Sequence, residues 1–428
     1  MSRLSVDLRP LRGSRDLRLL YGGRAISQLG SAITTVAAGL QVFDLTHSSL
    51  AVGALSVAEA VPMVSGMLAG GVLADRMDRR RLILSSQLFA GAFIVGLALN
   101  AASAHPRLWP LYVFAAASGA ALGLGAPART AATATLVPPT QLPAAAALNS
   151  TVNKTAALVG PLIGGLVVDR FGFATGFGAD AFSFLIYVVV AWGMRPLPPA
   201  AQTTGTGRSS VAEAFSYVRR HTLVIGILLI DADAMVFGMP SAVFPALASD
   251  TFHGGATVVG LLYAAPAAGA LIGAATSGWI SAVRRAGLVL LGSVLLWGGA
   301  IAGFGLSRVL PVALLLLVVA GAADLVSEVL RSSLLQLSIP DTLRGRLTAL
   351  WLAQANGAPA FGNLEAGAVA TVSSPAISVI SGGAACMLGA LLLSRVLPAL
   401  RQARLGATAE RPATELAPAA GRHGRGGR

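Results

Sequence analysis

The sequence predicts an all-α membrane protein that crosses the lipid bilayer many times. Hydrophobic residues make up 55% of the 428 residues, charged residues make up only 11%, and the mean hydropathy is +0.73. Soluble proteins carry about 25% charged residues, because their surfaces require them. The 50 glycines and 22 prolines lie among long apolar runs, where closely packed membrane helices tolerate both residue types. The composition therefore excludes a soluble globular fold.

Twelve membrane spans in two groups of six are predicted from the apolar runs. A helix needs about 20 apolar residues to cross about 30 Å of hydrocarbon. The first group is expected at 18–43, 51–74, 82–102, 108–135, 143–168 and 174–194. The second group is expected at 222–248, 257–281, 286–306, 309–337, 345–371 and 375–397.

The arginines fall mainly in alternate gaps between these spans, which predicts the orientation of the chain. Short loops with an excess of arginine and lysine remain in the cytoplasm. With a cytoplasmic N-terminus, the outer gaps hold only Arg107, Arg170 and Arg308. We therefore expect both termini in the cytoplasm. The net charge of +13 is explained by this topology, so no nucleic-acid partner is expected.

The two groups of spans define the expected domain organisation. A prolonged polar stretch with three prolines separates them, and the C-terminal residues lack any periodicity. The predicted parts are a cytoplasmic N-terminus (1–17), a first six-helix bundle (18–194), a cytoplasmic linker (195–221), a second six-helix bundle (222–400) and a disordered cytoplasmic tail (401–428).

The two halves also resemble each other, as expected of transporters built from internal repeats. Glycines recur at corresponding places of the second and eighth spans. A shift of 207 residues places Gly53, Gly66 and Gly71 on Gly260, Gly273 and Gly278. This pattern favours a duplicated six-helix unit.

The loop after the second span, residues 71–81, carries a family signature. Its pattern is a glycine, three residues, Asp-Arg, two residues and Arg-Arg, which resembles the signature loop of the major facilitator superfamily. The commonest form has glycine where this chain has Asp78. The resemblance implies a conformational latch that does not touch substrate. The latch residues would be Gly71, which allows two helices to approach, Asp75, which accepts backbone N–H bonds, and Arg76, Arg79 and Arg80.

A second motif lies in the fifth span, where the chain reads Gly-Pro-x-x-Gly-Gly. This element resembles one found in the drug and metabolite exporters of the same superfamily. A proline bend flanked by small residues permits a close helix contact, and ordinary tight packing is the alternative explanation. The motif residues are Gly160, Pro161, Gly164 and Gly165.

Residues 15–400, apart from the linker, resemble siderophore exporters in the drug/proton antiporter branch of this superfamily. The resemblance runs through residues 41–48, 244–248, 260–265 and 345–354. It implies export of a siderophore or related hydrophobic or anionic metabolite, driven by protons. We expect a monomer in the bacterial inner membrane. The alternative is a broad-specificity multidrug efflux pump.

Acidic residues inside the spans are the candidates for proton binding. A charge at the bilayer centre is expensive, so it normally faces a cavity or a partner. Glu59 lies in the second span, and Asp231 and Asp233 lie in the seventh, about 200° apart on a helix. We assign proton coupling to Glu59 and to one of these two aspartates. Asp324, Glu328 and Arg331 follow one face of the tenth span and are interpreted as a self-neutralising ladder.

Basic and amide side chains in the first and fifth spans are the substrate-binding candidates. Lys154 is the one lysine of the chain and adjoins Asn153, while Arg24 and Gln28 are spaced four residues apart. A base facing the cavity would attract an anionic catecholate or carboxylate. The alternative is that Lys154 and Arg24 extend to the membrane interface.

Motifs for other function classes are missing from the sequence. A phosphate loop ends in Gly-Lys-Ser/Thr, but no glycine precedes Lys154. Neither Gly-x-Ser-x-Gly nor His-Glu-x-x-His occurs, and the five histidines are too far apart to form a metal site. With Cys386 as its one cysteine, the chain can form no intramolecular disulfide. We expect a transporter rather than an enzyme, with no ATP, cofactor or metal.

Overall fold

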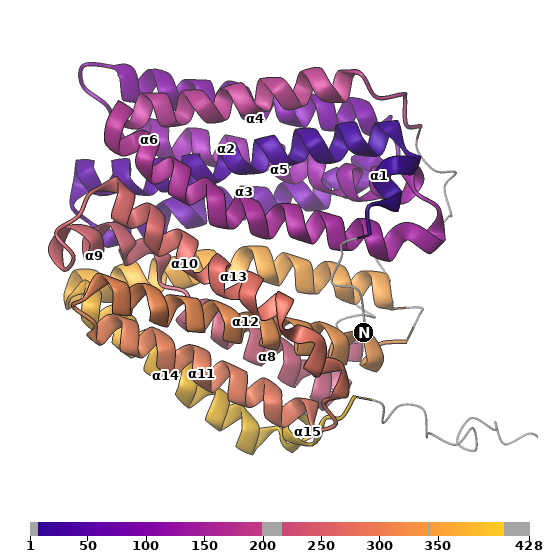
Figure 1. The fold of residues 1–428 in the computed structure, drawn as a ribbon, viewed down its shortest axis with the longest axis vertical. Coiled ribbons are helices and arrows are strands. Elements are labelled where there is room, and N and C mark those ends of the chain that lie inside the picture. Colours follow the sequence, from indigo (N-terminus) through magenta and orange to yellow (C-terminus); the bar gives the residue numbers. More distant parts are fainter. Residues whose placement is uncertain (1–6, 199–215, 341–342, 406–428) are drawn as a thin grey trace, which may run out of the picture.

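The computed structural model describes residues 7–198, 216–340 and 343–405, and it is helical with no strand in these ranges (Figure 1). Two bundles of long helices lie side by side, one coloured indigo to magenta and the other red to yellow. The first contains α1 (Arg9–Gly13), α2 (Arg15–Thr46), α3 (Ser49–Ala74), α4 (Arg79–Ala102), α5 (Leu108–Leu136), the short helix η1 (Pro139–Gln141) and α6 (Leu142–Trp192).

The second bundle begins after the linker and has the same number of crossings. It contains α8 (Thr222–Phe237), η2 (Ser241–Val243), α9 (Phe244–Asp250), α10 (Ala256–Ala275), η3 (Ser277–Ala282), α11 (Ala286–Leu306), α12 (Leu310–Ser338), α13 (Arg344–Val372), α14 (Pro375–Val396) and α15 (Pro398–Gln402).

The helix α6 contains two membrane crossings that meet at Gly172. This residue has a φ of +80°, which interrupts the helical backbone and which glycine adopts without strain. Ile33 of α2 contacts both Gly164 before this point and Gly176 after it. Since one residue touches both arms, the chain reverses direction at Gly172. These arms are the predicted fifth and sixth spans.

The described residues account for all twelve predicted crossings. Ten segments are long and apolar enough to cross a membrane, with α6 counted once and α8 joined to α9. The two arms of α6 add one crossing. The twelfth is α13, which has 29 residues but carries Gln354, Asn363 and Glu365 among its polar side chains. The predicted fold class of two six-helix bundles is confirmed.

The seventh span is broken rather than continuous, which corrects the predicted helix over 222–248. α8 ends at Phe237, and Gly238 and Pro240 separate it from η2 and α9. Trp297 Nε1 donates to the carbonyl oxygen of Gly238 at 2.9 Å, and Asn363 Oδ1 accepts from the backbone nitrogen of Ala242 at 3.0 Å. These side chains satisfy the backbone groups that the break releases. The eighth span is also shorter than predicted, because its α-helix ends at Ala275.

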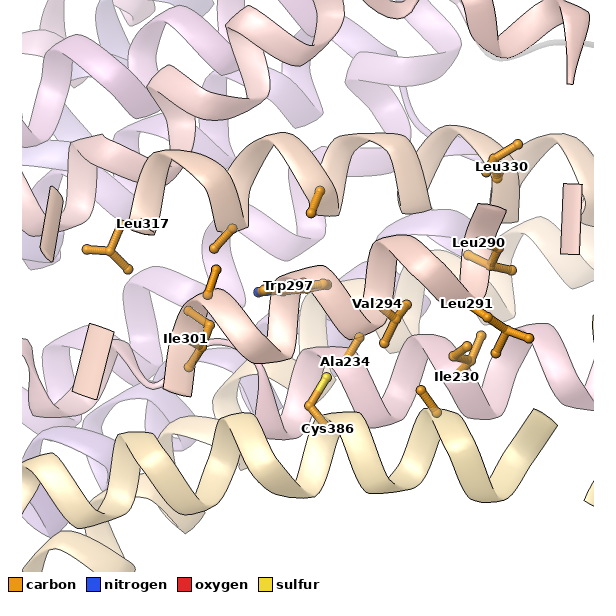
Figure 2. Packing of buried hydrophobic residues seen from close by; sticks show 14 of the residues in the cluster. Ile230, Ala234, Leu290, Leu291, Val294, Trp297, Ile301, Leu317, Leu330 and Cys386 are labelled. Atoms are coloured by element: carbon orange, nitrogen blue, oxygen red, sulfur yellow. The ribbon is translucent and has the colours of Figure 1, made fainter. Parts of the chain in front are cut away.

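Buried apolar residues form one cluster mainly in the second half and two mainly in the first half. In the second half, residues from α8, α11, α12 and α14 interlock around Trp297, which is 3% exposed (Figure 2). The first half has two clusters, one near each end of its helices. The end that contains residues 71–81 and the start of α2 is called the latch end, and the end that contains Thr46–Ser49 is called the opposite end. Trp297 is therefore a packing residue.

Corresponding glycines make corresponding contacts in the two halves, which supports the duplication. Gly66 of α3 packs directly on the backbone of Ala120 in α5. Gly273 of α10, its predicted counterpart, packs on Ala322 in α12, where an added Cβ would lie 3.4 Å from the Ala322 Cα. The same pair of helices is therefore held together by the same kind of residue in each half.

Two of the predicted segments lie largely outside the described residues. These are the middle of the linker, residues 199–215, and the tail beyond residue 405. Residues 216–220, at the end of the predicted linker, are helical.

Candidate functional site

Glu59 lines a small polar cavity inside the first bundle. The cavity has a volume of about 100 Å³ and lies between α2, α3, α5 and α6. Its polar walls come from Ser31, Thr34, Thr35, Ser56, Ser118 and, from the second bundle, Tyr263. A candidate proton site predicted from the sequence therefore lies where a small molecule or ion could reach it.

A second acid, Asp180 in the second arm of α6, lines the same cavity and was missed by the sequence interpretation. Its side chain is fully buried, Thr34 Oγ1 donates to Oδ2 at 2.6 Å, and Ser183 Oγ donates to Oδ1 at 3.1 Å. No basic side chain pairs with it among the described residues. The signal was present, because an aspartate inside an apolar span is by default a functional candidate.

Asp231 belongs to a buried ion cluster in the second bundle. Arg331 of α12, which is 1% exposed, pairs through Nη1 with Asp231 Oδ1 at 2.8 Å and through Nη2 with Asp324 Oδ1 at 3.4 Å. Gln354 Nε2 of α13 donates to Asp231 Oδ2 at 2.8 Å. The cluster therefore ties α8, α12 and α13 together.

Glu328 departs from the predicted ladder along α12. Its carboxylate pairs with Lys154 Nζ of α6 at 3.1 Å, with side chains 40% and 29% exposed, instead of with Arg331. The pair joins the two bundles. This pair and the cluster around Arg331 together contain two cations, Lys154 and Arg331. They also contain three carboxylates, those of Asp231, Asp324 and Glu328. When all five groups are charged, one negative charge is uncompensated.

Asp233 faces a different helix from Asp231. Its carboxylate lies against Gly389 of α14, and its Oδ2 is buried without a hydrogen-bond partner among the described residues. Asp231 is thus the aspartate that shares a charge network with the other bundle through α12, whereas Asp233 points away from it. The two aspartates left open by the sequence therefore have different surroundings, and only Asp231 belongs to the ion cluster among the described residues.

Three of the four substrate-binding candidates form a continuous polar strip. Gln28 Nε2 of α2 donates to Asn153 Oδ1 of α6 at 3.1 Å, and Lys154 is the next residue. Arg24 lies one helical turn before Gln28 toward the latch end and is half-buried. Arg129 of α5 lies close enough to Arg24 for their two positive charges to interact. Arg129 lies inside the bundle, where its Nη1 is buried.

Two arginines of the latch loop donate hydrogen bonds to oxygen atoms within the first bundle. Arg79 Nη1 donates to Thr135 Oγ1 of α5 at 2.6 Å, and Arg80 donates to the carbonyl oxygen of Trp192 at the end of α6. Cations are favourable at helix C-termini. Asp78 caps α4 by accepting from the Arg81 backbone nitrogen at 2.9 Å, so the unusual aspartate has a structural role. Asp75 is exposed, and its carboxylate has no partner among the described residues.

The close approach predicted for Gly71 occurs one residue earlier. An added Cβ on Gly71 would meet nothing within 4 Å, whereas one on Gly70 would overlap the backbone of Leu124 in α5. α3 presents Gly66 and Gly70, one turn apart, to α5. This arrangement leaves Gly71 on a neighbouring face, because successive helical residues differ by about 100°.

The Gly-Pro-x-x-Gly-Gly motif packs α6 against helices of both bundles. Gly160 and Gly164 contact Ala32 and Ile33 of α2, and an added Cβ on Gly165 would lie 2.6 Å from the carbonyl oxygen of Ala256 in α10. The two halves therefore meet closely here, toward the opposite end. Gly53 makes a similar contact to the backbone of Asn363 in α13.

A larger side chain at Gly165 is expected to open this contact. Overpacking costs about 1–3 kcal/mol, so Gly165→Val should lower the population of the conformation closed at the opposite end about 5- to 150-fold. Spin labels at Thr175 and Ser249, both exposed near that end, would report longer distances. Gly178→Val is the matched control, because an added Cβ there meets nothing within 4 Å. An unchanged distance distribution in Gly165→Val would contradict the prediction.

A family model described as a transmembrane secretion effector of the major facilitator type matches residues 6–424. The chain belongs to the major facilitator superfamily. It is 31% identical to the enterobactin exporter EntS of Citrobacter koseri over 399 residues, covering 93% of this chain and 96% of the relative. It is 32% identical to EntS of Shigella boydii serotype 18 with the same coverage.

Solved structures of this superfamily share the fold. A POT family transporter in complex with 5-aminolevulinic acid has a TM-score of 0.72 at 14% identity, covering 90% of this chain and 97% of that one. A bacterial homologue of the human lysosomal transporter Spinster has a TM-score of 0.70 at 16% identity, covering 91% and 98%. The protein is therefore a multi-pass membrane transporter of a small molecule rather than an enzyme.

Proposed function

We propose that this transporter exports an anionic siderophore or a related metabolite from the cytoplasm in exchange for protons, by alternating access. The similarity to enterobactin exporters across 93% of the chain supports the cargo class. The observation that carries the proposal is the ion pair between Lys154 and Glu328, which joins the bundles next to the polar strip of Gln28 and Asn153.

This ion pair provides a physical link between cargo and proton. An anionic cargo that approaches Lys154 competes with Glu328 for the same ammonium group. Once displaced, Glu328 adds to the uncompensated negative charge around Asp231 and Asp324, which favours uptake of a proton. Binding of cargo therefore changes the affinity of the same charge network for a proton, which couples the two ligands.

Alternating access is supported by the uneven contact between the bundles. Glycine contacts at Gly53 and Gly165 bring the halves close toward the opposite end, while the Lys154–Glu328 pair lies partly exposed nearer the latch end. With the N-terminus in the cytoplasm, as the arginine pattern predicts, we infer that this conformation opens toward the cytoplasm. Cargo would enter there and leave after the bundles rock to the other arrangement.

The test measures export from cells that accumulate a catecholate siderophore. Export should stop when a protonophore removes the proton gradient while ATP is held constant, since a membrane potential supplies about 2.3 kcal/mol per charge per 100 mV. Continued export against a gradient in the presence of protonophore would overturn proton coupling.

The cargo class is tested by replacing Lys154. Lys154→Ala should weaken binding of anionic cargo and spare neutral cargo. Unchanged affinity of Lys154→Ala for the catecholate would favour a broad-specificity multidrug efflux pump.

Asp75 is expected to affect the rate of cycling rather than the binding of cargo. Its carboxylate is exposed and unpartnered in this conformation, so any bond it makes belongs to another conformation of the cycle. Asp75→Asn should slow turnover about tenfold, equivalent to about 1.4 kcal/mol, with unchanged equilibrium affinity. Asp78→Asn is the control, because asparagine caps helices as well as aspartate does. A variant that loses binding but cycles normally would refute the latch role.

A further inference from the structure

Two arginines near the latch end of the first bundle have no acidic partner. Arg24 of α2 and Arg129 of α5 interact electrostatically with each other and with the Tyr187 hydroxyl in the second arm of α6. Neither arginine forms an ion pair within the described ranges. Both are half-buried inside a membrane bundle.

Hydrogen-bonding groups at the same place lack partners. The Tyr187 hydroxyl belongs to a side chain that is 1% exposed, and it forms no hydrogen bond to the described residues. Arg129 Nη1 is likewise buried and unpartnered, while its Nη2 donates to the carbonyl oxygen of Leu122 at 3.0 Å. Buried polar groups normally have partners, so each exception requires an explanation.

The packing around Tyr187 fixes these groups in position. Gly23, the residue before Arg24, lies directly against the Tyr187 ring, where any larger side chain would overlap it. The neighbouring Tyr21 hydroxyl donates to the carbonyl oxygen of Ala145 at 3.0 Å, which joins α2 to the first arm of α6. The site is therefore assembled before any ligand arrives.

An anionic oxygen group would satisfy all three side chains at once. Two guanidinium groups repel each other where water is scarce, and a negative charge between them removes this repulsion. Arginine presents a planar fork that matches a carboxylate or phosphate, and a tyrosine hydroxyl can donate to the same oxygen. Lys154 differs, because Glu328 already neutralises it in this conformation.

We propose that Arg24, Arg129 and the Tyr187 hydroxyl form a preformed site for an anionic oxygen group of the cargo, a carboxylate or a catecholate. The inference rests on the proposed export function, in which cargo enters from the latch end. The anion would bind here first, one helical turn from Gln28, before it competes with Glu328 for Lys154. A phospholipid phosphate has the same chemistry and is the alternative source of the anion.

The test uses the full-length protein in nanodiscs of phosphatidylcholine, with 2,3-dihydroxybenzoate as the probe and uncharged catechol for comparison. Each arginine is expected to contribute a charge-assisted hydrogen bond to the binding free energy of the carboxylate. Arg24→Gln and Arg129→Gln should therefore each weaken binding of the carboxylate about tenfold. Both should leave catechol unaffected. Tyr187→Phe keeps the ring against Gly23 and should weaken binding by a smaller factor. Arg395→Gln, on the exposed end of α14, is the matched control.

Two outcomes would overturn the assignment. One is wild-type affinity for the carboxylate in folded Arg24→Gln and Arg129→Gln. The other is that phosphatidylglycerol competes for the site only when both arginines are present, whereas binding of 2,3-dihydroxybenzoate does not depend on them. This result would assign the site to lipid. Failure of the proposed function gives a different result from failure of the anion site. Export would then be insensitive to protonophore, but carboxylate binding would still depend on both arginines.

Discussion

Replacing Arg331 with methionine is expected to destabilise the second bundle by about 3–5 kcal/mol, the usual result of removing one partner from a buried ion pair. Arg331 is 1% exposed and pairs with Asp231 and Asp324. Methionine has a similar length but no charge, so the Asp231 carboxylate would remain buried with Gln354 as its hydrogen-bonding partner. The loss should appear as a lower unfolding temperature of the purified protein in detergent.

Second-site changes distinguish charge from packing in this prediction. Adding Asp231→Asn to Arg331→Met returns the cluster to its wild-type net charge, with one uncompensated carboxylate, and should recover a large part of the stability, because replacing both partners of the buried pair is far less costly than replacing one. Arg395→Met is the matched control, since Arg395 is exposed at the end of α14. A double variant no more stable than Arg331→Met would show that Arg331 acts mainly by filling space.

The fold could be predicted from the sequence because the membrane imposes one dominant constraint. Each crossing must be a long apolar helix, so spans can be counted from apolar runs, and arginines mark the loops. The deviations occur where a local feature overrides this rule. Gly238 and Pro240 break the seventh span, and the break is tolerated because Trp297 and Asn363 satisfy the released backbone groups.

The candidate site was only partly predictable, because pairing between distant helices is not encoded in spacing. The sequence places Glu328 and Arg331 on one face of α12, but Glu328 pairs with Lys154, which is 174 residues away in the chain. Asp180 and Arg129 each stand alone in their spans, and their significance arises from neighbours on other helices. Glu59, Asp231 and Asp233 were proposed as candidates because each is an acid inside an apolar span.

Replacing Glu59 with glutamine is expected to abolish uphill export and to leave cargo binding and downhill exchange intact. Glutamine keeps the shape and hydrogen-bonding capacity of a protonated glutamate but cannot release a proton. Glu59 and Asp180 line one cavity of about 100 Å³ without a basic partner among the described residues, so proton binding there removes a charge that the bundle does not otherwise neutralise. Transport by reconstituted protein should be measured with and without an imposed proton gradient.

The comparison of three single variants locates the coupling residue. Asp180→Asn should resemble Glu59→Gln, because two carboxylates in one cavity influence each other's protonation and act as a unit. Asp233→Asn should retain uphill export, since Asp233 lies against Gly389 of α14 and faces neither the cavity nor Arg331. If Asp233→Asn abolishes uphill export while Glu59→Gln and Asp180→Asn sustain it, Asp233 carries the proton, and the cavity between α2, α3, α5 and α6 has a different role.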